Sequence, residues 1–135
     1  MTDNPLPGLP LIESPLFRAL LPSLGLNDQE TRIGLDLHSR GYAVLDFPDP
    51  DLDARIDRIK ANLGPRYQID FAASDSDKTT GERRIQDAWR FDEDVKAIAA
   101  NTQVIALLGK LYGRSAFPFQ TLTFQLAPNR ARTRI

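Results

Sequence analysis

The most strand-like run in the chain reads Phe117-Pro118-Phe119-Gln120-Thr121-Leu122-Thr123-Phe124-Gln125. From Phe119 onward the side chains alternate between two faces, and β-branched and aromatic residues at a period of two are typical of a β-strand. Such a strand needs a partner, because an unpaired strand leaves its backbone groups without hydrogen bonds. Residues 42–47, which read YAVLDF, are the other segment with strand character. We therefore expect these two segments to pair.

The composition is that of an ordinary globular domain. The 135 residues suffice for one domain, and 41% of them are hydrophobic and 26% charged. The net charge of −1 gives no electrostatic reason to expect binding to nucleic acid or to an anionic membrane. No apolar run approaches the roughly 20 residues that span a bilayer, and the N-terminus lacks the features of a secretory signal. The chain has no cysteine, so we expect a cytoplasmic protein without disulfides.

Helices are predicted where apolar residues recur at helical spacing between a capping residue and a glycine. The first lies between Asn27, a good N-cap, and Gly41 at its C-terminal end, with Glu30 in the capping-box position. The fold class is therefore α+β, with a helical first part and a strand that follows it. The other predicted helices are 52–63, ended by Gly64-Pro65, then one that begins at 92, and 102–112, ended by Gly113.

Three segments differ in character. Residues 1–26 are rich in proline and leucine, and they form an arm that either packs its leucines on a larger body or is a floppy tail. Residues 27–125 carry the predicted helices and strands. Residues 126–135 differ in character from the strand before them. We therefore divide the chain into an N-terminal arm (1–26), the main portion of a domain (27–125) and a divergent tail (126–135).

Two positions have both a structural and a chemical interpretation. His38, the only histidine, is either a metal ligand or base, or a solvated histidine at a helix end. Trp89 either anchors helix-to-sheet packing, with its neighbouring arginines in salt bridges, or lies beside a substrate-facing pair, Gln86 and Arg90. A metal site built on two histidines is impossible with this chain alone.

Two blocks carry a resemblance to a known family. Residues 84–91 read R-I-Q-D-A-W-R-F, and residues 111–122 read L-Y-G-R-S-A-F-P-F-Q-T-L. Both blocks resemble bacterial members of the phytanoyl-CoA dioxygenase family. Residues 41–47 are similar to the G-Y-x-V-x-x-F strand at the start of that fold. The resemblance covers residues 28–125.

The resemblance implies a non-haem iron(II) enzyme that uses 2-oxoglutarate and O₂ to hydroxylate a C–H bond of a small-molecule substrate. The implied fold is a double-stranded β-helix (jelly roll), of which this chain would hold only the N-terminal helices and first strands. In the family an H-x-D pair and a distant histidine hold the iron and leave positions open for co-substrate and O₂. The resemblance places Gln120 and Thr121 in the 2-oxoglutarate or substrate pocket of a complete protein. Gln86 and Arg90 are further candidates for substrate binding.

The sequence departs from the family where the iron ligands belong. After the strand the family reads G-T-[EQ]-x-x-x-H-S-D, whereas residues 126–135 read LAPNRARTRI. Codons can be chosen for residues 127–135 such that a shift of the reading frame by a single base gives G-T-E-P-R-T-H-S-D. We therefore expect a frameshifted or prematurely ended N-terminal fragment. The alternative is a genuinely short relative with a divergent tail.

Two functions follow. The first is a truncated oxygenase whose parent would be an iron(II) and 2-oxoglutarate-dependent hydroxylase. This chain, with no catalytic or metal-binding residue of its own, would then be inactive and would bind neither iron nor 2-oxoglutarate. The second is a small non-catalytic binding protein, because a truncated β-helix exposes strand edges and apolar helix faces. The substrate and the oligomeric state are left open.

Overall fold

The structure, a computed structural model, describes residues 4–70 and 84–124. They form helices and one small antiparallel sheet, so the predicted α+β class is confirmed. The chain is organised in two compact units. The first unit contains residues 4–49 and 100–117, and the second contains the described part of 50–99 together with 118–124. None of the helices in these residues has the length and apolar character that crossing a membrane requires.

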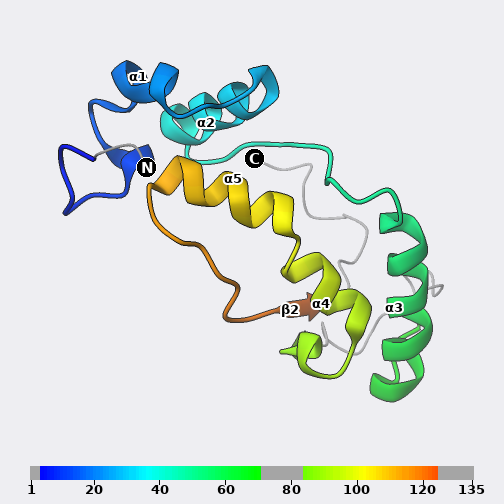
Figure 1. The fold of residues 1–135 in the computed structure, drawn as a ribbon. Coiled ribbons are helices and arrows are strands. Elements are labelled where there is room, and N and C mark those ends of the chain that lie inside the picture. Colours follow the sequence, from blue (N-terminus) through cyan, green and yellow to red (C-terminus); the bar gives the residue numbers. More distant parts are fainter. Residues whose placement is uncertain (1–3, 71–83, 125–135) are drawn as a thin grey trace, which may run out of the picture. The chain divides into compact units, whose positions relative to one another are not determined.

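The helices of the first unit, which are drawn as ribbons in Figure 1, bury one hydrophobic core. Because Leu11 and Leu24 are buried in it, the prediction that the N-terminal arm packs its leucines on a larger body is confirmed for these residues. The elements are η1 (Leu11–Glu13), α1 (Phe17–Leu20), η2 (Leu21–Ser23), α2 (Asp28–Arg40) and α5 (Thr102–Tyr112). The buried residues are Leu11, Ile12, Phe17, Leu24, Ile33, Leu107 and Leu111.

The ends of α2 are as predicted. Asn27 Oδ1 accepts a hydrogen bond from the Glu30 backbone N–H at 2.9 Å, and Glu30 Oε2 accepts one from the Asn27 N–H at 3.1 Å. This reciprocal pair satisfies backbone donors that the first turn of a helix leaves free. Gly41 ends the helix with a φ of 79°, a left-handed conformation that glycine adopts without a steric penalty. Lys110 Nζ lies 3.2 Å from Glu30 Oε2 and so joins α5 to α2.

Helix α2 approaches its neighbours most closely at Gly34, which is buried. A Cβ atom added there would lie 2.9 Å from Leu111 Cδ2 and 3.3 Å from Phe17 Cζ. Carbon atoms in van der Waals contact lie about 3.5–4.0 Å apart. The absence of a side chain at Gly34 therefore lets α5 and α1 pack against α2.

Residues 42–47 are not a paired strand, so that prediction is wrong. The segment follows α2 and returns to the N-terminal end of α5, where Asn101 Nδ2 donates to the Pro48 carbonyl at 3.2 Å. Ala43 packs on the core of the first unit. The helices thus bury part of this segment, while its predicted partner, the strand near residue 122, belongs to the second unit.

A small sheet and two helices build the second unit. The strand predicted at 119–125 is shorter in the described residues and covers Leu122–Phe124 (β2), while Gln125 lies outside them. Its partner is β1 (Arg84–Gln86), in antiparallel register with Ile85 opposite Thr123. The other elements are α3 (Leu52–Tyr67), η4 (Ala88–Arg90) and α4 (Glu93–Ala99). The buried core consists of Leu63, Ile85, Ala88 and Val95, with Ile59, Tyr67, Ile69 and Trp89 packed against it.

Helix α3 continues through Gly64-Pro65, where the sequence predicts its end. Gln68, with a φ of 56°, ends the helix instead, and the Ile69 N–H donates to the Gly64 carbonyl at 2.8 Å. The added turn brings Tyr67 against the core and within 6.3 Å of the Phe91 ring, measured between ring centroids. Burial of this aromatic side chain offsets the hydrogen bond that Pro65 cannot donate.

Two glycine substitutions in the first unit should have different effects on stability. G34A should lower the free energy of unfolding, because overpacking costs about 1–3 kcal/mol and exceeds the gain of about 1 kcal/mol in helix propensity. The Cβ that G109A adds would lie 3.5 Å from the Arg114 carbonyl oxygen, an ordinary van der Waals distance. G109A should therefore leave the stability unchanged or raise it by up to about 1 kcal/mol. Urea unfolding followed by circular dichroism measures both. Equal effects of the two variants would contradict the close packing at Gly34.

Candidate functional site

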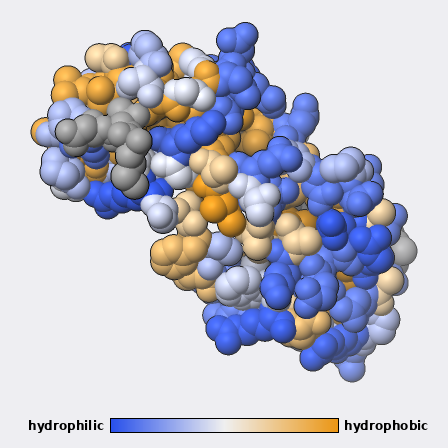
Figure 2. All heavy atoms as spheres, viewed as in Figure 1, coloured by the Kyte–Doolittle hydropathy of each residue, from blue (hydrophilic) through white to orange (hydrophobic). Residues whose placement is uncertain are grey.

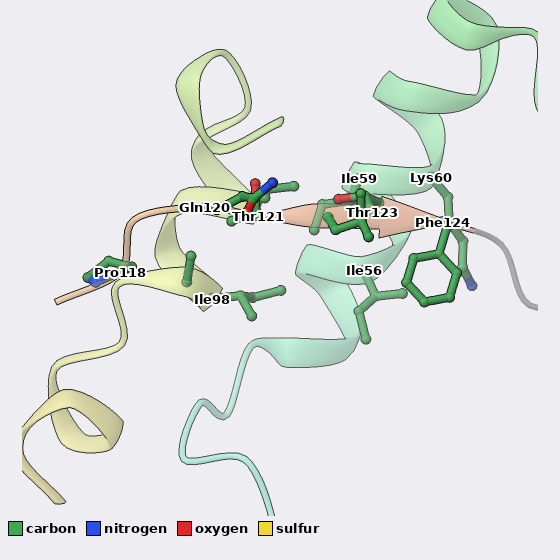
Figure 3. A pocket seen from close by; sticks show the side chains of 12 residues that line it. Ile56, Ile59, Lys60, Ile98, Pro118, Gln120, Thr121, Thr123 and Phe124 are labelled. Atoms are coloured by element: carbon green, nitrogen blue, oxygen red, sulfur yellow. The ribbon is translucent and has the colours of Figure 1, made fainter. Parts of the chain in front are cut away.

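The second unit contains an apolar cavity of about 600 Å³ (Figure 3). Cavities of a few hundred Å³ with mostly apolar walls and a few polar groups are the usual form of small-molecule sites. The lining residues come from α3, from α4 and from the segment 118–124. They are Ile56, Ile59, Lys60, Val95, Ile98, Ala99, Pro118, Gln120, Thr121, Leu122, Thr123 and Phe124.

The walls of the cavity are two helix faces. Figure 3 shows Ile56 on α3 and Ile98 on α4, and the segment that carries Thr121 and Thr123 lines the same cavity. Ile56 and Ile59 lie on the apolar stripe of α3, while Ile98 is one turn beyond Val95 on α4. All these helix residues are at least partly buried. The helical spacing of the sequence therefore produces the apolar walls directly.

Thr121 is held in place by three hydrogen bonds to the turn after β1. Its carbonyl accepts from the Asp87 N–H at 2.8 Å, and its N–H donates to Asp87 Oδ1 at 3.3 Å. Its Oγ1 accepts from the Trp89 N–H at 3.4 Å. Asp87 has a φ of 54°, a strained conformation for a non-glycine residue. These hydrogen bonds therefore fix both the strained turn at Asp87 and the segment that lines the cavity at Thr121.

The predicted site residues separate into two groups. Gln120 and Thr121 line the cavity, and so does Lys60, which belongs to no motif in the sequence. Gln86 and Arg90 do not line it, and both are exposed. Arg90 Nε lies 3.8 Å from Asp87 Oδ2, a weak contact at the surface. Of the two predicted pairs, only Gln120 and Thr121 therefore lie at the cavity.

Trp89 packs on the core of the second unit, next to the sheet, which agrees with its interpretation as a packing anchor. Its backbone N–H donates to Thr121, which lines the cavity. Its indole nitrogen is buried and has no acceptor among residues 4–70 and 84–124. A buried indole N–H usually finds a partner. The tryptophan therefore links the core to the cavity lining, with one donor still available.

Two carboxylates fix α4 against α3. Asp92 is 5% exposed; its Oδ1 accepts from the Val95 N–H at 2.8 Å, and its Oδ2 accepts from Asn62 Nδ2 at 2.6 Å. Asp94 accepts from Arg55 Nη1 at 2.9 Å and from Arg58 through Nε at 2.8 Å and Nη2 at 2.7 Å. The bidentate geometry from Arg58 makes this a strong charge-assisted contact. The distance between the two cavity walls depends on these bonds.

The charge of Asp94 is favoured by the same contacts. The hydrogen bond from Arg58 is the largest cause that lowers the pKa of Asp94 to about 2 from its ordinary value of 3.8. Burial opposes this change, and the hydrogen bond from Arg55 adds to it. The carboxylate is therefore ionised over the whole neutral and mildly acidic range.

The His38 side chain is half-buried and hydrogen-bonded, so its interpretation as a solvated histidine is wrong. Its Nδ1 lies 2.7 Å from the Ile12 carbonyl oxygen, and its ring lies 5.0 Å from the Phe17 ring, measured between centroids. Because a carbonyl can only accept, the Nδ1 atom carries the proton. His38 thus ties α2 to η1 and is a structural residue of the first unit.

The described residues do not fit an iron site of the expected kind. Such a site needs two histidines and a carboxylate, and the sequence has a single histidine. Within the two described ranges no three side chains of His, Cys, Asp or Glu are grouped closely enough to hold a metal ion. The segment 126–135, where the family carries its H-x-D pair, lies outside the described residues.

Comparisons with known proteins give no assignment. The chain matches no family model, no curated protein and no solved structure. The family resemblance therefore rests on the residues of the two blocks, 84–91 and 111–122.

Acid should lower the free energy of unfolding of the second unit, because it protonates Asp94. Because its folded pKa is depressed, its contribution to the free energy of unfolding is present above the unfolded value near 3.8 and is lost as the pH falls toward about 2. D94N should lower stability at pH 6 and should flatten the dependence between pH 4 and 2. Urea unfolding at several pH values measures this. D57N is the matched control, since Asp57 is 80% exposed and lies 3.8 Å from Lys60; if it flattened the profile equally, the assignment to Asp94 would be wrong.

Proposed function

We propose that this chain is the N-terminal portion of an iron(II) and 2-oxoglutarate-dependent hydroxylase of the phytanoyl-CoA dioxygenase family. Its helices and first strands would then belong to an incomplete jelly roll. The iron ligands would lie outside these 135 residues, in the H-x-D reading of the shifted frame and beyond it. The described residues of this chain do not fit the metal, so residues outside them would hold the iron.

The observation that carries the proposal is the position of Gln120 and Thr121. Both lie on the segment 118–124 that borders the apolar cavity, and the second sequence block, residues 111–122, overlaps that segment. The first block, residues 84–91, supplies β1 and the turn that holds Thr121. The second block thus contributes part of the cavity lining, and the first block supports it from behind through Asp87 and Trp89.

The role proposed for this portion is substrate placement. Apolar side chains such as Ile56, Ile59 and Ile98 would contact the part of the substrate that carries the C–H bond and would exclude water. Gln120 and Thr121 offer polar groups at the same cavity. An oxygenase portion of this kind binds and orients, while the reactive chemistry belongs to the cofactors.

Sequencing the source gene from the codons of Phe117 through the region beyond residue 135 tests the family proposal. We expect a single inserted or deleted base that restores the G-T-E-P-R-T-H-S-D reading, with a further histidine codon downstream. An unshifted frame in independent isolates, with no H-x-D codons in any downstream frame, would overturn it. The purified chain should also retain no stoichiometric iron after chelation, measured by elemental analysis.

The second candidate is a non-catalytic protein that binds an apolar small molecule. The cavity itself favours it, because its apolar walls come from residues present in this chain. The gene sequence separates the two candidates, since a confirmed frame leaves the binding function and removes the oxygenase.

Both candidates predict that an apolar probe binds the cavity. The chain should bind the neutral dye Nile red, and I98N should weaken binding by about tenfold or more, since burial of an isoleucine contributes about 1.5–3 kcal/mol. L16N is the matched control, because Leu16 is an exposed apolar residue of the first unit. Fluorescence titration measures both dissociation constants. Equal weakening by the two variants, or none by I98N, would rule out the cavity as the binding site.

A further inference from the structure

The segment 42–47 has the side-chain alternation of a strand and lies on the helices of the first unit. Ala43 packs on the core, and Leu45 and Phe47 line a second, smaller cavity of about 370 Å³ beside α2 and α5. Tyr42 and Val44 face outward and are 60% and 74% exposed. Asp46 is exposed as well, although it also borders the smaller cavity. Ala43 and Phe47 are half-buried and Leu45 is 37% exposed, so one face of the segment is partly covered by its own unit, whereas the face with Tyr42 and Val44 is free.

The backbone of this segment is unpaired. Residues 42–46 make no backbone hydrogen bond to the rest of the described chain. Figure 1 draws the segment that leaves α2 as an extended path without an arrow. On the face in view, Figure 2 shows hydrophobic residues at the surface among hydrophilic ones. An extended run of apolar residues with free N–H and C=O groups is a template for another strand.

We propose that residues 42–46 pair, antiparallel and in symmetric register, with the same segment of a second copy of this chain. The register is centred on Val44, so Val44 lies opposite Val44 of the second copy and Tyr42 lies opposite Asp46. This pairing is an isologous interface, in which the same surface serves both copies. It goes beyond the proposed function and uses none of the cavity residues of the second unit.

The side chains on the free face complement themselves in this register. Two valines meet at the centre, and β-branched residues pack well across a sheet. On either side of them, the Tyr42 hydroxyl can donate to the Asp46 carboxylate of the other copy. The interface thus contains two such polar pairs around one apolar contact, with no like charges opposite each other.

The two-fold symmetry also leaves the face with Ala43 and Leu45 turned toward the helices of its own copy. A two-fold axis perpendicular to the sheet turns an antiparallel strand onto its partner without exchanging the two faces. Ala43 and Leu45 would therefore stay on the helices of their own copy. A register shifted by one residue would place these inward residues opposite the outward ones. The alternation of the side chains thus selects the antiparallel direction and excludes the odd register shifts, while the Tyr42–Asp46 complementarity selects the register centred on Val44.

Single cysteines test the register, because the chain has no cysteine of its own. Opposite residues in an antiparallel pair have Cα atoms about 4.5–5.5 Å apart, within the span of about 4.4–6.8 Å that a disulfide bridges. V44C should form a covalent dimer under mild oxidation, visible on non-reducing gels. A mixture of Y42C and D46C should link faster than either variant alone. L16C, at another exposed apolar residue of the same unit, should link at the slow rate of random collision.

Sedimentation over a range of protein concentrations tests the association itself. The wild-type chain and V44T should form dimers, while V44K should be monomeric, because two ammonium groups would then lie directly opposite each other. L16K should remain dimeric. Thermal melts should show all these variants folded, since Val44 is 74% exposed.

Several results would overturn the proposal. They are a monomeric wild type at every concentration, a V44K protein that still dimerises, larger mixed assemblies, or V44C linking no faster than L16C. Failure here leaves the proposed function untouched, because the gene sequence and the dye titration do not depend on Val44.

Discussion

Asp92 and Asp94, at the start of α4, both hold this helix to α3. Asp92 satisfies the Val95 N–H in the first turn of α4 and receives the Asn62 amide, while Asp94 receives two guanidinium groups. A buried carboxylate is costly unless its oxygens are hydrogen-bonded, and here each carboxylate has partners on α3. The second unit has only a two-stranded sheet and a small buried core in the described residues. Its cavity walls therefore depend on polar bonds as much as on apolar packing.

Local signals in the sequence predict much of the helical structure. The capping box at Asn27 and the left-handed Gly41 follow from residue type and spacing alone, and both are found. The end of α3 does not follow, because the breaker Gly64-Pro65 is outweighed by tertiary packing of Tyr67. Strand pairing fails for a related reason. Residues 84–86 are too short a run to show alternation, yet they pair with β2, whereas the longer run at 42–47 stays unpaired.

The candidate site shows the same division between local and long-range information. The family resemblance points to Gln120 and Thr121, which do line the cavity, and the helical spacing of Ile56 and Ile59 indicates the apolar face of α3. Gln86 and Arg90 are close to Trp89 in sequence, but they do not line the cavity. The contacts of Asp94 with Arg55 and Arg58 were missed, although two arginines three residues apart on one helix face are a usable signal for a carboxylate partner. Which carboxylate they bind depends on how the helices pack, and residue spacing does not contain that information.

The single tryptophan lies in only one of the two units. Because Trp89 packs on the core of the second unit, the intrinsic indole emission of the protein reports on that unit alone. The first unit, whose core is built from leucine, isoleucine and phenylalanine, contributes helical ellipticity but no indole signal. The natural chain therefore carries a built-in optical label by which the cooperativity between its two cores can be resolved without any added dye.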